Sequence, residues 1–141
     1  MIGPKAEFRA AGAKRLFSVE QANSSLPLVR RIVQDIIPAA KKVRDLQEQL
    51  ESLQKNGDPD QTESTIAELT KAREQYQQFR DELSRVGCRL ADETSGTVEF
   101  QAVINAKQVV LSWRVGESEI TYWHDLGQDS HERRLLSELD A

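Results

Sequence analysis

Apolar and polar residues alternate through the stretch from Gly96 to Asp125, which organises the rest of the chain. In three successive runs the apolar residues fall on every second position, the period of a strand with one buried face. These positions are Val98, Phe100, Ala102 and Ile104, then Val109, Leu111, Trp113 and Val115, then Ile120 and Tyr122. Breaks at residues 105–107 and at Gly116-Glu117 separate the runs. The pattern predicts a three-stranded antiparallel β-meander over residues 96–125.

The breaks also predict how the strands pair. We expect a two-residue loop at Ala106-Lys107, which places Phe100 opposite Trp113 and Glu99 opposite Arg114. A second two-residue loop is expected at Gly116-Glu117, because the first central position of a type II′ turn needs the positive φ that glycine adopts.

The second loop places Arg114 opposite Glu119 and Val110 opposite Trp123. Both loops therefore bring a carboxylate beside Arg114, which predicts a ladder of Glu99, Arg114 and Glu119 on the polar face. In this register the ring of Trp123 lies on the same polar face as the ladder.

Upstream of the sheet, the apolar spacing changes to three and four, which indicates helices. Ser18 and Gln21 fit a capping box, with Phe17 ahead of it, and we expect a short helix from there to about Ser24. A long helix should then start at Pro27, since proline suits the first helical position. Its apolar seam continues to Leu53, with a kink expected at Pro38.

A loop around Gly57 separates this helix from a second long one. Asp58-Pro59 suits a helix start, and apolar residues three and four apart run from Ile66 to Val86. Two long helices joined by a short loop predict an antiparallel helical hairpin over residues 18–86.

The chain is therefore expected to be one α+β domain over residues 18–141, preceded by a flexible basic leader over residues 1–17. The helical hairpin packs against the three-stranded meander, because such a sheet cannot stand alone in water. Residues 126–141 form a tail that ends in a short helix over Glu132–Leu139. If the sheet does not cover the whole hairpin, the apolar seam beyond it stays bare, which predicts a homodimer through the helices.

Composition excludes several classes of protein. A formal net charge of −4 disfavours a general nucleic-acid binder. Only the basic leader would support nucleic-acid binding. The single cysteine, Cys88, excludes an internal disulfide framework and favours a reducing, cytoplasmic location. No apolar run reaches the length of a membrane span, and no cofactor is expected because phosphate loops, dinucleotide fingerprints and Cys-x-x-Cys pairs are absent from the sequence.

Several short motifs resemble those of a known family. The run from Gly96 to Phe100, the element Trp113-Arg-Val-Gly-Glu117 and the pair Trp123-His124 are similar to an uncharacterised family of small prokaryotic proteins, catalogued as domain of unknown function 2203. Ala22-Asn23 and Leu26-Pro27 resemble the N-terminal pattern of that family. The chain departs from the family in having Ser112 where a cysteine is expected, and in its tail. The resemblance implies a shared fold and site region and no activity.

The first candidate site lies around His124. His124, Asp125 and His131 could meet at a metal or form an acid–base pair, with Arg133 arriving from the tail. The alternative is a strand-end histidine bonded to a loop carboxylate. In the predicted register Glu117 lies at the other end of the sheet, too far away to share a metal with His124.

The second candidate is the polar face itself, with Glu99, Arg114, Glu119 and Trp123. It would be either a surface ion-pair ladder or a contact patch for a protein partner. Cys88 is a third candidate, but no histidine lies near it in sequence to act as a base, which favours an inert thiol.

The preferred hypothesis is a self-associating interaction module that is not an enzyme and presents the polar face to a partner. The alternative is a metal- or small-ligand-binding protein, or an enzyme, with its site at His124, Asp125 and His131. The tail discriminates between them: residues 126–134 folded back over His124 to enclose a pocket would favour the alternative.

Overall fold

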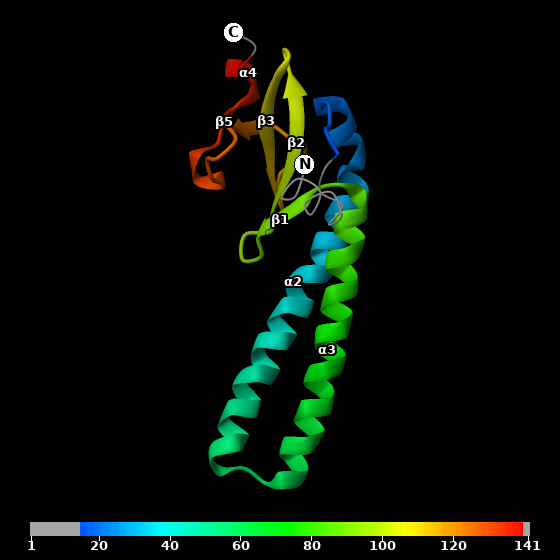
Figure 1. The fold of residues 1–141 in the computed structure, drawn as a ribbon, viewed down its shortest axis with the longest axis vertical. Coiled ribbons are helices and arrows are strands. Elements are labelled where there is room, and N and C mark those ends of the chain that lie inside the picture. Colours follow the sequence, from blue (N-terminus) through cyan, green and yellow to red (C-terminus); the bar gives the residue numbers. More distant parts are fainter. Residues whose placement is uncertain (1–14, 140–141) are drawn as a thin grey trace, which may run out of the picture.

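The computed structural model describes residues 15–139, in which two long helices lie against one face of an antiparallel sheet (Figure 1). Helix α2 spans Val19–Asn56 and α3 spans Pro59–Val86. The strands are β1 (Arg89–Asp92), β2 (Thr97–Ile104), β3 (Lys107–Arg114), β4 (Tyr122–His124) and β5 (Arg134–Leu135), and they neighbour one another in chain order. The predicted α+β class is confirmed, but the sheet has five strands, not three.

The two additional strands are short and lie at the two edges of the sheet. Strand β1 has four residues, of which only Leu90 is buried, and β5 has two exposed residues. Segments this short carry too little alternation for a period to be recognised. The expected tail helix is also shorter than predicted, because Glu132 ends the 3-10 helix η1 (Ser130–Glu132) and only Leu136–Leu139 forms α4.

Local capping explains where the long helices begin. The Ser18 hydroxyl accepts a hydrogen bond from the Gln21 N–H, and the Gln21 side chain accepts one from the Ser18 N–H, both at 3.0 Å, so the predicted capping box is confirmed. Asp58 caps α3 as expected, with Pro59 in its first turn. The predicted end near Ser24 is wrong, since α2 runs unbroken through Pro27 and Pro38. The apolar stripe that α2 buries on both sides of Pro27 offsets the hydrogen bond lost there.

The core lies between the sheet and the bases of the two helices. Six alternating apolar residues of β2 and β3 face it and are completely buried, and Ile104 at the end of β2 is partly buried; the six are Val98, Phe100, Ala102, Val109, Leu111 and Trp113. From the helices, buried side chains such as Val29, Ile32, Val33 and Leu83 meet them. Phe17 belongs to this core as well, and pairs with Ala102 as a parallel bridge beside β2. The last residue assigned to the basic leader is thus part of the folded domain, while residues 1–14 lie outside the described residues.

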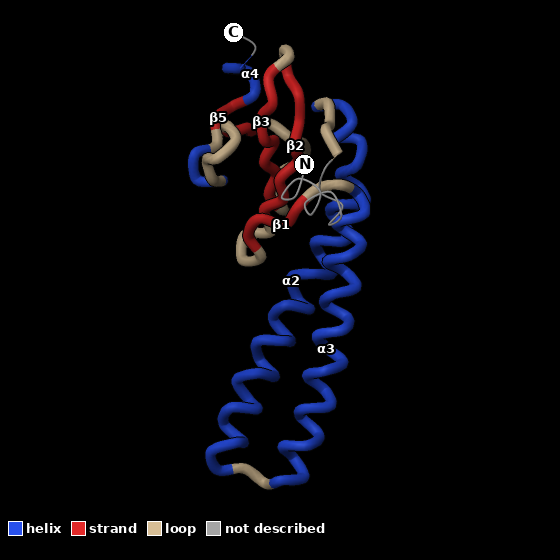
Figure 2. Tube along the Cα trace, viewed as in Figure 1, coloured by secondary structure: helices blue, strands red, loops and turns tan. Residues whose placement is uncertain are grey.

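The hairpin extends far beyond the sheet (Figures 1 and 2). We call residues 38–75 the arm and residues 15–37 with 76–139 the head, because Ile37 and Tyr76 are the last helical residues on each side that pack on the head core. In the arm, Leu46, Leu69 and Ala72 form a separate small core with Val43 and Leu50 against it. The seam is therefore closed at Leu46 and Leu69, and only Ile66 among its large apolar side chains is exposed.

The predicted pairing of β2 with β3 is wrong by two residues. Phe100 lies opposite Leu111 and Glu99 opposite Ser112, while Arg114 pairs with Thr97. The loop consists of Asn105 and Ala106, whose φ values of 53° and 64° are those of a type I′ turn. Asparagine is one of the residues that best tolerates this conformation. An even shift preserves the buried face but separates Glu99 from its predicted partner.

The predicted pairing of β3 with β4 is wrong by one residue, which exchanges the faces. Val110 lies opposite His124, and Leu111 lies opposite Trp123. Residues 115–121 connect the strands in place of a two-residue loop, and Gly116 (φ 104°) is the third residue of a turn closed by the Glu117 N–H and the Arg114 carbonyl. Trp123 therefore joins the core side, and His124 takes its place on the polar face beside Glu99.

Candidate functional site

Glu99 and His124 form a hydrogen-bonded pair on the face of the sheet that the helices leave open. The His124 Nε2 atom lies 3.2 Å from the Glu99 Oε2 atom. The imidazole is 1% exposed and the carboxylate 11%, so the pair is almost removed from water. Strand β2 supplies Glu99 and β4 supplies His124; on β3 between them, Glu99 is opposite Ser112 and His124 is opposite Val110, so the pair is diagonal across the sheet.

The hydrogen bonds of the imidazole define how protons are held in this pair. His124 Nδ1 lies 2.9 Å from the carbonyl oxygen of Asp125, and because a carbonyl only accepts, Nδ1 must carry a hydrogen. Nε2 faces a carboxylate oxygen, so a further proton must lie between Nε2 and Glu99. It makes the pair either an imidazolium–carboxylate ion pair or a neutral imidazole bonded to a carboxylic acid.

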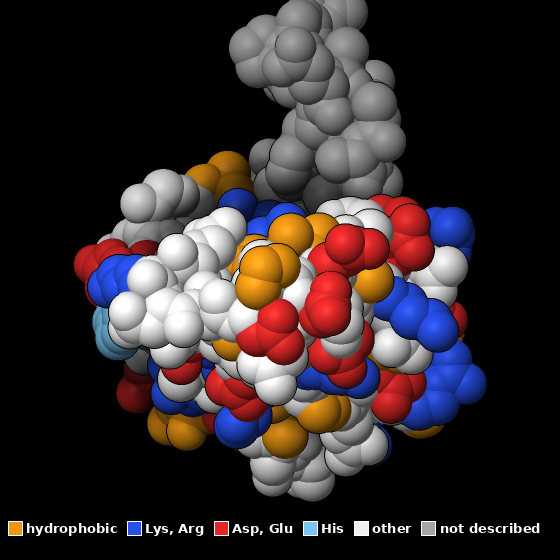
Figure 3. All heavy atoms as spheres, turned by 90° about the horizontal axis from the view of Figure 1, so that it is seen from below, with side chains coloured by type: hydrophobic (Ala, Val, Ile, Leu, Met, Phe, Trp, Pro, Cys, Tyr) orange, Lys and Arg blue, Asp and Glu red, His pale blue; other side chains and the backbone are white. Residues whose placement is uncertain are grey.

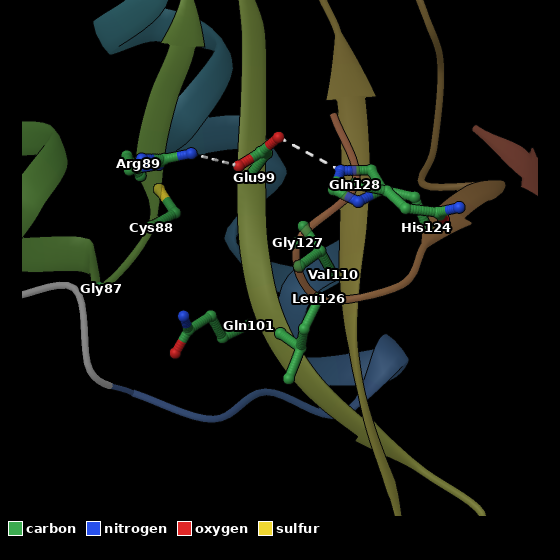
Figure 4. A pocket seen from close by; sticks show the side chains of 10 residues that line it. All are labelled: Gly87, Cys88, Arg89, Glu99, Gln101, Val110, His124, Leu126, Gly127 and Gln128. Carbon is green, nitrogen blue, oxygen red and sulfur yellow. Dashed lines mark hydrogen bonds and ion pairs between the residues drawn. The ribbon is translucent and has the colours of Figure 1, made fainter. Parts of the chain in front are cut away.

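Arg89 engages the other oxygen of the same carboxylate. Its guanidinium lies 2.7 Å from Glu99 Oε1, and the two residues are directly opposite in the pairing of β1 with β2. The side chain of Arg89 is 59% exposed. Figure 4 shows Glu99 between Arg89 and His124, with both interactions drawn. The three side chains thus form a polar row across the sheet that ends in solvent at Arg89.

A cavity of about 270 Å³ opens over this row. The sheet supplies one wall, through Glu99, Gln101, Val110 and His124, and residues 126–128 of the tail supply another (Figure 4). Gly87, Cys88 and Arg89, at the end of α3, line the cavity as well. A second hollow of about 260 Å³ shares Arg89, Glu99 and Gln128 with the first, and its lining includes Asp92, Asp129 and His131.

Cys88 lines the cavity as a protonated thiol. Burial raises the pKa of its thiol from 9.0 to about 12, against the opposing effects of a backbone hydrogen bond and of the Arg15 charge. The Sγ atom lies 3.8 Å from the carbonyl oxygen of Leu83. Since the thiolate is the nucleophilic form, the expectation of an inert cysteine agrees with this environment.

The tail is held over the cavity by polar contacts. Gln128 accepts a hydrogen bond from the Asp125 N–H at 3.0 Å, and the Arg134 guanidinium lies 2.8 Å from the Asp125 carboxylate. Hydrogen bonds from Arg134 and then from Lys107 lower the pKa of Asp125 below its ordinary value of 3.8. The Arg134 guanidinium also stacks 4.2 Å above the centre of the Trp123 ring. These contacts close the tail over His124, the arrangement that favours the ligand-binding hypothesis.

The Trp-Arg-x-Gly-Glu element builds a turn beside this site. Trp113 Nε1–H donates to the Glu117 carbonyl at 2.9 Å, and the Glu117 carboxylate accepts from the Arg114 N–H, also at 2.9 Å. Arg133 arrives from the tail and lies 3.0 Å from the Glu117 carboxylate, with its guanidinium 4.0 Å from the centre of the Tyr122 ring. Glu117 and Arg133 therefore anchor the tail to the turn.

Other predicted site residues lie apart from one another. His131 is 84% exposed and faces Asp129. Arg114 donates through Nε to Thr97, and Glu119 lies in the connection between β3 and β4, so the expected ladder through Arg114 does not form in this register. Over residues 15–139, no group of three His, Cys, Asp or Glu side chains is arranged to hold a metal ion.

Three polar side chains that line the cavity were not among the candidates from the sequence, namely Arg89, Gln101 and Gln128. A type I′ turn at Asn105 would have corrected the pairing of β2 with β3. The corrected pairing would still not have identified Arg89, because β1 lacks an alternating pattern. It would not have identified Gln128 either, because the position of a loop residue does not follow from strand pairing.

Comparison with known proteins gives one match. The family model described as "Uncharacterized conserved protein (DUF2203)" matches residues 15–136, which include every helix and strand of the described residues except α4 beyond its first residue. Neither the curated proteins nor the solved structures contain a match to the chain. Along residues 15–139, no helix is both long enough and apolar enough to cross a membrane.

Proposed function

Since the chain belongs to the DUF2203 family of uncharacterised conserved proteins, its role must be inferred from its own site, and we propose that it binds a small polar ligand in the cavity over Glu99 and His124. The observation that carries this proposal is the buried Glu99–His124 pair, which faces an open cavity with the tail as one of its walls. A buried polar pair of this kind contributes little net stability, so its position at the wall of a cavity supports a role in binding.

The chemistry of the walls defines the class of ligand. Glu99 accepts hydrogen bonds, Arg89 donates them, and the Gln101 amide does both, while Val110 and Leu126 provide apolar contact. A cavity of about 270 Å³ is at the small end for ligand sites, which span roughly 300–1,000 Å³. The ligand is therefore a compact molecule with both donors and acceptors.

Binding accounts for the site better than covalent catalysis does. The Cys88 thiol is protonated, and both ring nitrogens of His124 are already engaged, by Asp125 and by Glu99. A general base needs a nitrogen or oxygen that faces the reacting group. The Glu99 carboxylate is held by Arg89 and His124, and its remaining lone pairs can accept a hydrogen bond from a ligand without proton transfer, which makes the non-enzymatic role the better supported proposal.

A fragment screen by NMR tests the pocket. We expect small polar fragments to shift the backbone resonances of residues 99–101 and 126–128, and a Glu99→Gln variant to lose this response. Glu119→Gln, which removes a carboxylate outside the cavity, is the matched control and should respond like the natural chain. Fragments that bind Glu99→Gln and the natural chain equally well would rule out the proposed site.

The interaction role expected from the sequence is a second proposal, supported by a different region. The arm extends beyond the sheet and has only a small core of its own, so its surface is available to a partner (Figure 1). A homodimer through the helices is the form that we propose, and a reducing, cytoplasmic location is proposed with it from the single cysteine. A protein partner on the polar face of the sheet would also contact the tail, because residues 126–128 cover the region around His124.

A further inference from the structure

The arm carries its charges in two zones of opposite sign. Residues 45–68, the tip zone, contain seven acidic residues and one lysine, a formal charge of −6. Residues 38–44 and 69–75, the base zone, contain five basic residues and one glutamate, a formal charge of +4. The basic residues are Lys41, Lys42, Arg44, Lys71 and Arg73, and all five are exposed. Figure 3, which views the molecule from the tip, shows carboxylates gathered on the end of the arm.

Within one chain, the charges of the two zones can pair only at their boundary, where neighbouring turns of a helix meet. Lys41 pairs with Asp45 at 2.7 Å across the boundary, where both side chains are more than half exposed. The tip zone otherwise concentrates like charge at the end of a two-helix rod, which is unfavourable for an isolated chain. A surface of opposite charge would relieve this repulsion, and the base zone of another molecule is such a surface.

The geometry of the arm favours one orientation for that contact. Each helix contributes about 18 residues to the arm, or roughly 27 Å of length at 1.5 Å per residue. Two fully overlapping antiparallel arms place the outer part of each tip zone, residues 50–65 with a formal charge of −3, against the base zone of +4 of the other copy, whereas parallel arms place like charges together along their whole length. An antiparallel pair is also closed and two-fold symmetric, as most homodimers are.

One exposed apolar side chain lies near the middle of the arm. Ile66 is 45% exposed and sits about midway between the tip loop and the head on α3. In an antiparallel pair of fully overlapping arms, residues at this level approach the same residues of the second copy. Ile66 therefore supplies an apolar contact at the centre of a contact that is otherwise polar.

We propose that two copies of this chain associate through their arms in antiparallel orientation, with each acidic tip zone on the basic base zone of the other. This inference rests on the proposed self-association and is independent of the ligand pocket. The partner of the arm is then a second copy of the chain. The association is mainly electrostatic, since little apolar surface is exposed on the arm.

Salt dependence and charge exchange test the proposal with the full chain. We expect sedimentation equilibrium to show a dimer at 50 mM salt that weakens by about tenfold or more at 500 mM, because the screening length falls from about 14 Å to about 4 Å between these concentrations. A Lys41→Glu/Lys42→Glu/Arg44→Glu variant should weaken self-association roughly a hundredfold, since like charges then face each other. A Glu48→Lys/Glu51→Lys/Glu63→Lys variant should also be monomeric, and a mixture of the two variants should form a heterodimer.

Controls separate the orientation from the association itself. Glu119→Lys/Glu138→Lys changes the net charge outside the arm and should leave the dimer unchanged. Ala67→Cys, at the middle of the arm, should form a disulfide between copies on mild oxidation, and Asn56→Cys at the tip should not. A monomer under all conditions would overturn self-association. A dimer that cross-links at Asn56, or a mixture that fails to form a heterodimer, would overturn the antiparallel arrangement alone.

Discussion

The head and the arm consist of the same two helices, yet they are stabilised in different ways. In the head, α2 and α3 bury a continuous stripe against a sheet whose inner face holds six completely buried apolar side chains from β2 and β3. In the arm the same helices share a core of three buried apolar residues and expose dense charge. One amphipathic pattern therefore serves two purposes, because a stripe too narrow to build a core beyond the sheet still keeps two helices together. Substitutions in the head should therefore have large effects on stability, and substitutions in the arm should mainly affect binding to a partner.

The largest expected effect compares one substitution in both regions. Leu111→Ala in the head should lower the free energy of unfolding by about 4 kcal/mol, because the completely buried site cannot collapse around the cavity. Leu46→Ala in the arm should cost about 2 kcal/mol or less, because the side chain is 8% exposed and the helices can close on it. Urea unfolding measures both values, and equal costs would remove the distinction between the regions.

The next comparison concerns ion pairs. His124→Ala should cost about 3 kcal/mol, since it leaves the buried carboxylate of Glu99 without one of its partners and opens a cavity. Asp45→Ala, which breaks the exposed Lys41–Asp45 pair, should change the free energy of unfolding by less than about 0.5 kcal/mol. Thermal unfolding of both variants measures the two changes, at the same pH and salt concentration and at a protein concentration too low for self-association. A cost below about 1 kcal/mol for His124→Ala would mean that the pair is not held in place by the fold.

A smaller effect is expected from a single buried hydroxyl of the head. Ser112 is completely buried, and its Oγ atom lacks a hydrogen-bond partner among the described residues. Ser112→Cys should raise the free energy of unfolding by about 1 kcal/mol, because a thiol tolerates unpaired burial better than a hydroxyl. Ser112→Ala provides the control for lost volume. A variant less stable than the natural chain would indicate that the hydroxyl has a partner such as water.

The smallest effect is a local response of the tail to acid. The folded pKa of Asp125 is below its ordinary value of 3.8, so its contribution to stability is complete above that value and is lost as the pH falls through the folded pKa. Arg134 and Lys107 then lose their carboxylate partner beside Trp123, and we expect tryptophan fluorescence to change below pH 3.8. Asp125→Asn should abolish this transition, and a transition that persists in the variant would assign it to another carboxylate.

Local signals predicted the elements better than their pairing. The capping residues Ser18 and Asp58 act within one turn of helix, so their roles could be recognised from adjacent residues. Alternation identified the buried face of β2 and β3 correctly, since a shift of two residues preserves it. The face of β4 was wrong because the seven-residue connection before it breaks the count between Trp113 and Trp123.

The site was only partly predictable for the same reason. Glu99 and His124 were each recognised as candidates, but the pair exists only in the correct register of three strands. Arg89 and Gln128 reach the cavity through an edge strand and a loop, which no periodicity describes. Their placement depends on contacts between distant parts of the chain, and a single sequence does not encode these as a pattern.

The parallel bridge between Phe17 and Ala102 has a consequence for assembly. Hydrogen bonds from Phe17 N–H to the Gln101 carbonyl and from Val103 N–H to the Phe17 carbonyl fasten the start of α2 to the far side of β2, at 2.8 and 3.1 Å. Hairpin and meander each join neighbouring segments, whereas this bridge closes a loop that contains the whole arm, and closing a loop this long costs conformational entropy. Docking of Phe17 on β2 should accordingly be a late event in folding. On the ribosome, Phe17 would remain undocked until Ala102 has been synthesised and has emerged.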